Sequence, residues 1–256
     1  MERQITISRD GLNTPCLLRE PEYGVPRRLV LSVHGFAGNM REDIQENIAE
    51  EMELFNSVVL RFDFPAHGEN PETELTLRGC VDTLLNVAEY GREHYPELED
   101  LCVFATGFGA YVTLNALQDL IEMPGKVKLV IQTPGLRMHQ TVLNMMRLTK
   151  VTLEAMGSKT FNTRRPLEVS YSFYEELVEH NALTPYPIPF LILQGEYDDY
   201  IPREDIMNLR RLNERSKLVI IPGASHRFLE EGAWDMVLDL TRDWFDYEQV
   251  LLADSY

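Results

Sequence analysis

The stretch Leu101–Leu117, LCVFATGFGAYVTLNAL, decides the fold. It opens with the apolar run Leu101–Phe104, which is typical of a strand buried on both faces. Small residues follow at Ala105, Gly107, Gly109 and Ala110. Apolar residues at helical spacing follow. The order predicts a strand, a turn so sharp that only small residues fit around its apex, and a helix.

Length and composition set the scale of the fold. The chain has 256 residues, and its hydrophobic content of 44% is enough for a sizeable core. Strands alternate with helices along most of the chain, which favours a mostly parallel α/β sheet covered by helices on both faces. We predict one domain over residues 1–256, with a helical insertion at residues 134–187 after the sixth strand.

The remaining elements follow from apolar runs and periodicity. A hairpin is expected from segments 4–9 and 14–19, which flank the turn dipeptide Asp10-Gly11. Further strands are expected at Arg28–Val33, Ser57–Phe62, Val127–Gln132, Pro189–Gln194 and Lys217–Ile221. Helices are expected at Arg41–Phe55, Leu75–Tyr95 and Arg203–Leu212, and from Gly232 to about Leu251. Within the insertion we expect helices at 143–156 and 166–183, with a loop at 157–166.

Charge and composition exclude several classes of partner and cofactor. The formal net charge of −17 argues against nucleic acid and anionic membranes, because phosphate binding needs clustered Lys and Arg. The three cysteines show no metal-binding or redox spacing, so we expect no metal and no cofactor. No signal-peptide pattern opens the chain, and no apolar run is long enough to span a membrane, which predicts a cytoplasmic protein.

The elbow resembles that of the α/β-hydrolase family, which reads G-x-S-x-G. Laid on that pattern, the segment Ala105-Thr106-Gly107-Phe108-Gly109 places Ala105 at the first glycine and Gly107 at the nucleophilic serine. Glycine tolerates the backbone geometry of such a turn, so the turn can form without the serine. The resemblance therefore implies a hydrolase scaffold whose nucleophilic hydroxyl is missing.

The resemblance also implies the other members of a catalytic triad. Acyl transfer needs a base and a carboxylate that orients it. His226, in the loop after the last strand, matches the base of the family. Asp198 matches the acid, since the family signature G-x-x-D followed by Ile-Pro is present at Gly195–Asp198 and Ile201-Pro202. Asp199 is the rival for this role.

An oxyanion hole is implied by His34-Gly35-Phe36, which resembles the loop after the third strand of the family. The backbone N–H groups of Phe36 and Phe108 would form the hole. His34 itself is interpreted as a structural histidine. His67, in a turn that resembles the family's G-H-G turn, is interpreted in the same way.

Two other hydroxyls, those of Thr106 and Ser225, lie near the expected site but not at its apex. Thr106 is expected to point away from it, because neighbouring side chains at a strand end diverge.

In this family an insertion after the sixth strand is commonly a lid over the site. Candidate substrate walls are Met145, Met146, Tyr171 and Phe173, although such residues also serve simply to pack an insertion onto the core. Arg164-Arg165 could bind a substrate carboxylate or remain a solvated loop charge.

Within the family, the segments ITISRDG, HGF and RFDFPAHGEN look most like the small cinnamoyl or feruloyl esterase branch. We therefore expect a carboxylic ester hydrolase scaffold for short or aromatic acyl esters, inactive or nearly so because Gly107 replaces the serine by deliberate inactivation or a single loss.

Two alternatives remain open: a natural non-catalytic protein that binds a small apolar ligand, or an enzyme that uses the His–Asp dyad without a covalent intermediate. The expected partner is in each case a small molecule. The sequence does not fix the oligomeric state, and a homodimer is compatible with it.

Overall fold

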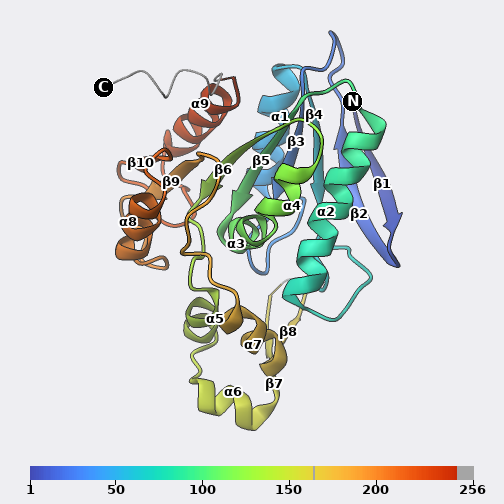
Figure 1. Ribbon diagram of the computed structural model, residues 1–256. Coiled ribbons are helices and arrows are strands. Elements are labelled where there is room, and N and C mark those ends of the chain that lie inside the picture. Colours follow the sequence, from blue (N-terminus) through green and yellow to red (C-terminus); the bar gives the residue numbers. More distant parts are fainter. Residues whose placement is uncertain (164, 247–256) are drawn as a thin grey trace.

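The computed structural model describes residues 1–163 and 165–246 (Figure 1). Its centre is an eight-stranded sheet in the order β1-β2-β4-β3-β5-β6-β9-β10. Strand β2 runs antiparallel to both of its neighbours, and all other pairs are parallel. This confirms the predicted α/β-hydrolase fold with its mostly parallel sheet. The strands are β1 (Glu2–Arg9), β2 (Leu12–Arg19), β3 (Arg28–Val33), β4 (Ser57–Phe62), β5 (Asp100–Thr106), β6 (Lys126–Gln132), β9 (Leu191–Gly195) and β10 (Lys217–Ile221).

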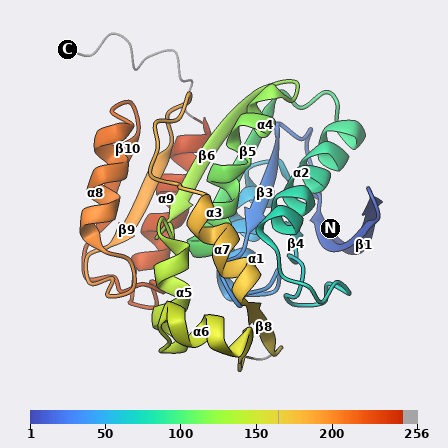
Figure 2. The same cartoon turned by 60° about the horizontal axis from the view of Figure 1, so that its bottom comes forward.

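Helices cover both faces of the sheet (Figures 1 and 2). On one face lie α1 (Asp43–Leu54) and α9 (Ala233–Asp246). The other face carries α2 (Leu77–His94), α3 (Gly107–Asn115), α4 (Leu117–Glu122) and α8 (Arg203–Leu212). Strand β5 shows why an unbroken apolar run is needed here. Its residues Leu101 and Val103 join the core under α2 and α3, whereas Cys102 and Phe104 join the core under α1 and α9.

The insertion follows β6 and differs from its sequence prediction in two places. The helix expected over 143–156 is two helices, α5 (Met138–Met146) and α6 (Lys150–Met156), which are separated at Arg147 by a left-handed backbone with φ of 54°. The loop expected at 157–166 contains strand β7 (Ser158–Phe161). That strand pairs antiparallel with β8 (Leu167–Ser170), where we expected the start of a helix.

The physical reason for this second difference is local. In β8, buried Leu167 and Val169 flank exposed Glu168, which is the two-residue alternation of a strand. The expected helix begins only at α7 (Tyr171–Glu179), where the Ser170 hydroxyl caps the first turn by accepting from the Phe173 N–H. Figures 1 and 2 both place α5, α6, α7 and the β7–β8 hairpin together beyond one edge of the large sheet.

Two helix ends also differ from the sequence prediction or lie beyond the described residues. The helix after the elbow ends at Asn115, and α4 begins as a separate element at Leu117. Helix α9 is described to Asp246, so the expected continuation over 247–251 lies outside the described residues. In the part of the chain that the structure describes, no helix combines the length and apolarity needed to cross a membrane.

Polar contacts join the insertion to the core. The hydroxyl of Tyr111, which is fully buried on α3, donates to the carbonyl of His180 at 2.8 Å and lies 3.3 Å from the carbonyl of Leu177. Arg137, just before α5, forms an ion pair at 2.9 Å with Asp205 on α8. The end of α7 and the start of α5 are thus each bonded to a core helix.

Replacing Tyr111 by Phe tests the first of these contacts. The variant keeps the ring but leaves the carbonyls of Leu177 and His180 without this donor, and we expect the free energy of unfolding to fall by about 1–3 kcal/mol. Urea unfolding measures this change. The control is Tyr197→Phe, at a side chain that is mostly exposed, where we expect a change within about 0.5 kcal/mol. Equal effects of the two substitutions would contradict the role of the Tyr111 hydroxyl.

Candidate active site

The candidate residues lie where three parallel strands end. Gly107 directly follows β5, Asp198 follows β9, and His226 lies in the loop after β10. Because β5, β6, β9 and β10 are parallel neighbours, their carboxyl ends share one edge of the sheet. Open α/β sheets place their sites at this edge.

The elbow at Gly107 has the geometry that a nucleophile would need. Gly107 has φ of +50°, a left-handed conformation that side chains adopt rarely, and a Cβ built there would meet only Gly35 Cα, at 3.9 Å. Gly109 is required for a different reason. A Cβ at that position would lie 2.4 Å from the carbonyl oxygen of His34, so only glycine lets α3 pack this closely on the end of β3.

A second close approach brings the His226 loop to the end of β9. A Cβ on Gly195 would lie 2.6 Å from the carbonyl oxygens of both Ala224 and Ser225. With glycine there, the two loops meet, and the Nδ1 of His226 lies 2.9 Å from Asp198 Oδ2. The Asp198 side chain is fully buried, whereas that of His226 is 27% exposed. The imidazole of His226 is therefore oriented by a buried carboxylate and remains accessible to solvent.

Asp198 is held as a carboxylate. Burial alone would raise the pKa of Asp198, but the hydrogen bond and charge of His226 and two backbone donors lower it below its ordinary value. Those donors are the N–H groups of Tyr200 and Ile201, at 2.9 and 3.0 Å from Oδ1. The rival Asp199 is exposed, and the carboxylate that contacts His226 is that of Asp198.

Sequence reasoning missed two neighbours of this pair. The buried amide of Gln194 donates to Asp198 Oδ2 at 2.8 Å. The ring of Tyr200 lies over the imidazole of His226, with 4.9 Å between ring centroids. A signal existed for Gln194, because it is the one polar residue in the apolar run PFLILQ. Tyr200 gave none, since an aromatic residue in a loop has many possible neighbours.

The side chains of the two residues expected to supply the oxyanion donors are in contact. The rings of Phe36 and Phe108 meet edge to face with 5.8 Å between centroids. Phe108 is the second residue of α3, and the first N–H groups of a helix have no partner within the helix. Its N–H also lies at the positive end of the helix dipole, a position that favours a negative charge.

His34 and His67 are bound to the backbone. His34 Nε2 accepts from the Phe64 N–H at 3.1 Å, and its Nδ1 lies 2.8 Å from the Gly35 carbonyl. His67 Nδ1 lies 2.8 Å from the Pro65 carbonyl. Burial lowers the pKa of His34 to about 4 and that of His67 to about 3. Both histidines are therefore neutral at physiological pH.

The two other candidate hydroxyls are engaged elsewhere. Thr106 Oγ1 lies 3.5 Å from the Val33 carbonyl, toward the end of β3. Ser225 lies beside Glu230, whose pKa is lowered by hydrogen bonds from the Ser225 hydroxyl and N–H. Neither group lies at the apex of the elbow, which is Gly107.

The four residues expected to line the substrate site differ in burial. Phe173 and Met146 are buried in the core, and the ring of Phe173 lies edge-on to Phe108 at 6.1 Å. Tyr171 is half-buried and stacks on Tyr174 at 5.8 Å. Met145 is half-buried on α5. Phe173 is thus the wall candidate placed directly against an elbow residue.

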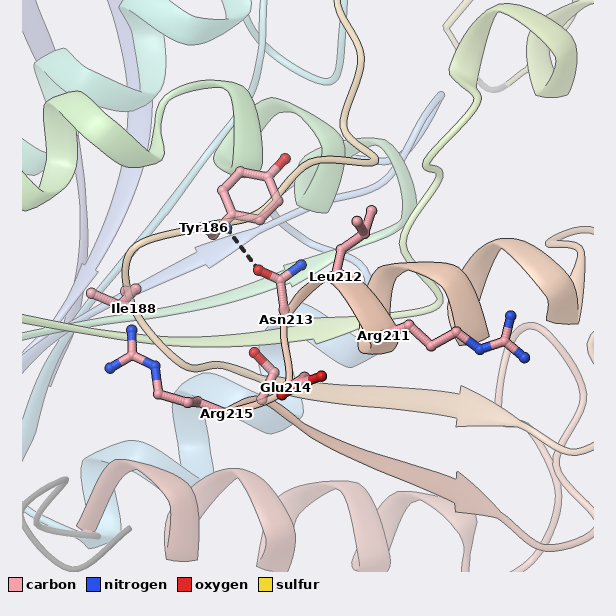
Figure 3. Close-up of a pocket in the computed structure, with 8 residues that line it drawn as sticks. Tyr186, Ile188, Arg211, Leu212, Asn213, Glu214 and Arg215 are labelled. Atoms are coloured by element: carbon pink, nitrogen blue, oxygen red, sulfur yellow. Dashed lines mark hydrogen bonds between the residues drawn. The ribbon is translucent and has the colours of Figure 1, made fainter. Parts of the chain in front are cut away.

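Two cavities lie outside these residues. One, of about 360 Å³, lies between the loop at 37–41, the turn at 63–69 and residues 163–167 of the insertion. The other, of about 400 Å³, is lined by residues of the segment 186–188 and the α8–β10 connection at 211–216 (Figure 3). It lies at the amino-terminal ends of β9 and β10, whereas His226 lies beyond the carboxyl end of β10. Among the described residues, no group of three acidic, histidine or cysteine side chains could hold a metal ion.

The sheet order, the turn at Gly107 and the His–Asp pair at the strand ends define an α/β protein of the hydrolase class. The chain belongs to the alpha/beta hydrolase family, whose model matches residues 30–240. Comparison with curated protein sequences gave no match.

Solved structures with the same fold cover nearly the whole chain. A putative hydrolase from Agrobacterium vitis S4 is similar with a TM-score of 0.80 and 17% identity, over 96% of this chain and 99% of that one. Est1E from Butyrivibrio proteoclasticus, with ferulic acid bound, gives 0.76 and 19%, over 93% and 96%. Alpha/beta hydrolase domain-containing protein 10 from mouse gives 0.74 and 18%, over 95% and 98%.

The two buried histidines predict how stability depends on pH. Folding holds both pKa values below 6.5, so below that pH the unfolded chain binds protons that the folded chain does not. The free energy of unfolding should therefore fall from about pH 6.5 to pH 5, by up to about 1.4 kcal/mol per pH unit for each histidine.

Urea unfolding at several pH values tests this dependence. A stability that stays constant from pH 6.5 to pH 5 would show that these imidazoles are not kept neutral by burial.

Proposed function

We propose that this chain is the scaffold of a carboxylic ester hydrolase for small acyl esters, including aromatic ones, in which Gly107 stands at the nucleophile position. The observation that carries the proposal is the 2.9 Å hydrogen bond between His226 and the buried Asp198. The open space around a Cβ at residue 107 supports it further. In this proposal His226 is the base, Asp198 is the acid, and Gly107 is the apex at which the attacking oxygen would stand.

In a chain with serine at residue 107, His226 would take the hydroxyl proton as the oxygen attacks the ester carbonyl carbon. The N–H groups of Phe36 and Phe108 would bind the resulting oxyanion. His226 would then protonate the leaving alcohol, and a water molecule would release the acid from the acyl-serine. With glycine at residue 107 the covalent step has no nucleophile. The remaining route is attack by a water that His226 deprotonates, and we expect it to be slow.

The insertion would cover the substrate in this scheme. Phe173 and Tyr171, at the start of α7, are the aromatic side chains of the insertion that we propose to contact the acyl group. Phe173 packs on Phe108 next to the elbow, which supports this role. Met145 and Met146, on α5, are the aliphatic counterparts in this proposal.

Restoring the hydroxyl is the decisive experiment. We expect Gly107→Ser to raise kcat/KM for p-nitrophenyl acetate and butyrate by at least about a thousandfold, because the residual rate without a nucleophile is small compared with that of a complete triad. The control is Gly107→Ala, which adds the Cβ without the hydroxyl and should gain nothing. A folded Gly107→Ser protein with no gain would reject the esterase scaffold.

The acid can be tested in the same background. In Gly107→Ser, Asp198→Asn should lower kcat by about 10⁴-fold, because an amide NH₂ would donate to Nδ1 where the carboxylate accepts from it, which favours the wrong tautomer, and an uncharged amide does not stabilise the imidazolium. Asp199→Asn is the matched control, since its side chain is exposed and His226 bonds to its neighbour. If both variants lose activity equally, Asp198 is not the orienting acid.

A further inference from the structure

Arg165 fastens the β7–β8 hairpin to the turn at residues 67–72. Its Nη1 donates to the carbonyl oxygens of His67, Gly68 and Asn70 at 3.0, 3.1 and 2.5 Å, and its Nη2 lies 3.3 Å from the carbonyl of Glu72. Among the described residues, no carboxylate lies within ion-pair distance of Arg165. A half-buried guanidinium that four carbonyls surround is neither a solvated loop charge nor an open anion site. It is a clamp made of charge-assisted hydrogen bonds.

The clamped turn has strained backbone. Ala66 has φ of 63°, a left-handed conformation that is unfavourable for a residue with a Cβ. Such a conformation persists only where the surroundings fix it. Asp63 fixes the turn from inside, because its Oδ2 accepts from the Glu69 N–H at 2.7 Å. Arg165 fixes the turn from the insertion.

The ring carried by this turn touches both proposed oxyanion residues. The imidazole of His67 stacks on Phe108 with 6.3 Å between centroids and 16° between planes. It meets the ring of Phe36 edge to face at 6.0 Å. The hairpin also reaches the oxyanion loop directly, because the ring of Phe161 on β7 lies 6.1 Å from that of Phe36.

A cavity of about 360 Å³ lies between the hairpin, the turn and the loop at 37–41. Beside this cavity, the four hydrogen bonds of Arg165 cross from the hairpin to the turn.

We propose that Arg165 is a positioning residue for the oxyanion hole: through the turn at 67–72 it holds the His67 ring against Phe36 and Phe108. The inference rests on the proposed function only for the role of the two N–H groups as oxyanion donors. The coupling between Arg165 and the segments around Phe36 and Phe108 does not depend on that function. In this proposal, detaching the β7–β8 hairpin from the turn at 67–72 also moves the N–H groups that would bind the oxyanion.

Hydrogen exchange measured by mass spectrometry tests the coupling without any catalysis. In Arg165→Gln we expect the segments at 34–40 and 63–72 to exchange at least about tenfold faster, expressed relative to β5 in the same sample so that general loosening cancels. Arg147→Gln is the matched control. It removes the same charge from an exposed position in the insertion and should change neither ratio.

Three exchange results bear on the proposal. Faster exchange in both segments supports it, and recovery toward the original rates in Arg165→Lys, whose ammonium can still donate to the carbonyls, supports it further. Faster exchange at 63–72 alone overturns it, because the clamp would then be local. No change in either segment overturns it as well.

An activity measurement adds the functional consequence. In the Gly107→Ser background, Arg165→Gln should lower kcat by about tenfold or more while KM changes by less than about threefold, since the oxyanion exists only along the reaction and a small misplacement of its donors is costly. A rise in KM with unchanged kcat would assign Arg165 to substrate binding instead and overturn the positioning role. If Gly107→Ser itself is inactive, the proposed function fails, and the exchange experiment still decides the coupling.

Discussion

The hydrogen bond between His226 and Asp198 depends on two loops that approach within van der Waals contact. Gly195 makes this approach possible, because any side chain there would collide with the carbonyls of the His226 loop. Around the pair, Gln194 donates to Oδ2 of Asp198, the oxygen that the imidazole also contacts, and the N–H groups of Tyr200 and Ile201 donate to Oδ1. The carboxylate is thus buried, charged and fully bonded, which keeps its position independent of any substrate.

Beside this polar arrangement lies an aromatic one. Phe36, Phe64, His67 and Phe108 contact one another around the elbow, and His34 joins them while it bonds to the backbone. Burial keeps the two imidazoles uncharged, so they behave here as aromatic rings with one polar edge. The only imidazole of the candidate site that is open to solvent is that of His226, on the other side of the elbow in the sheet order.

The sheet could be predicted from the sequence because its strands are continuous apolar runs, and β5 needs such a run to face two cores at once. The His–Asp pair could be predicted from a family signature in which both residues follow strand ends. The insertion was harder. Its strands β7 and β8 pair as a two-stranded hairpin, and four-residue strands carry too little periodicity to be separated from helix or loop. The contacts of Tyr200 and Arg165 depend on segments distant in sequence, so no local pattern could reveal them, whereas Gln194 lies only four residues from Asp198.

The backbone at Gly107 has a consequence for the evolution of this chain. In the left-handed region a serine is less favourable than glycine by roughly 1–3 kcal/mol, so a serine at this apex would have a strained backbone. Glycine removes that strain. Under the proposed function, glycine at this apex therefore relieves backbone strain at the same position where it removes the hydroxyl, so selection for thermal stability alone would retain it.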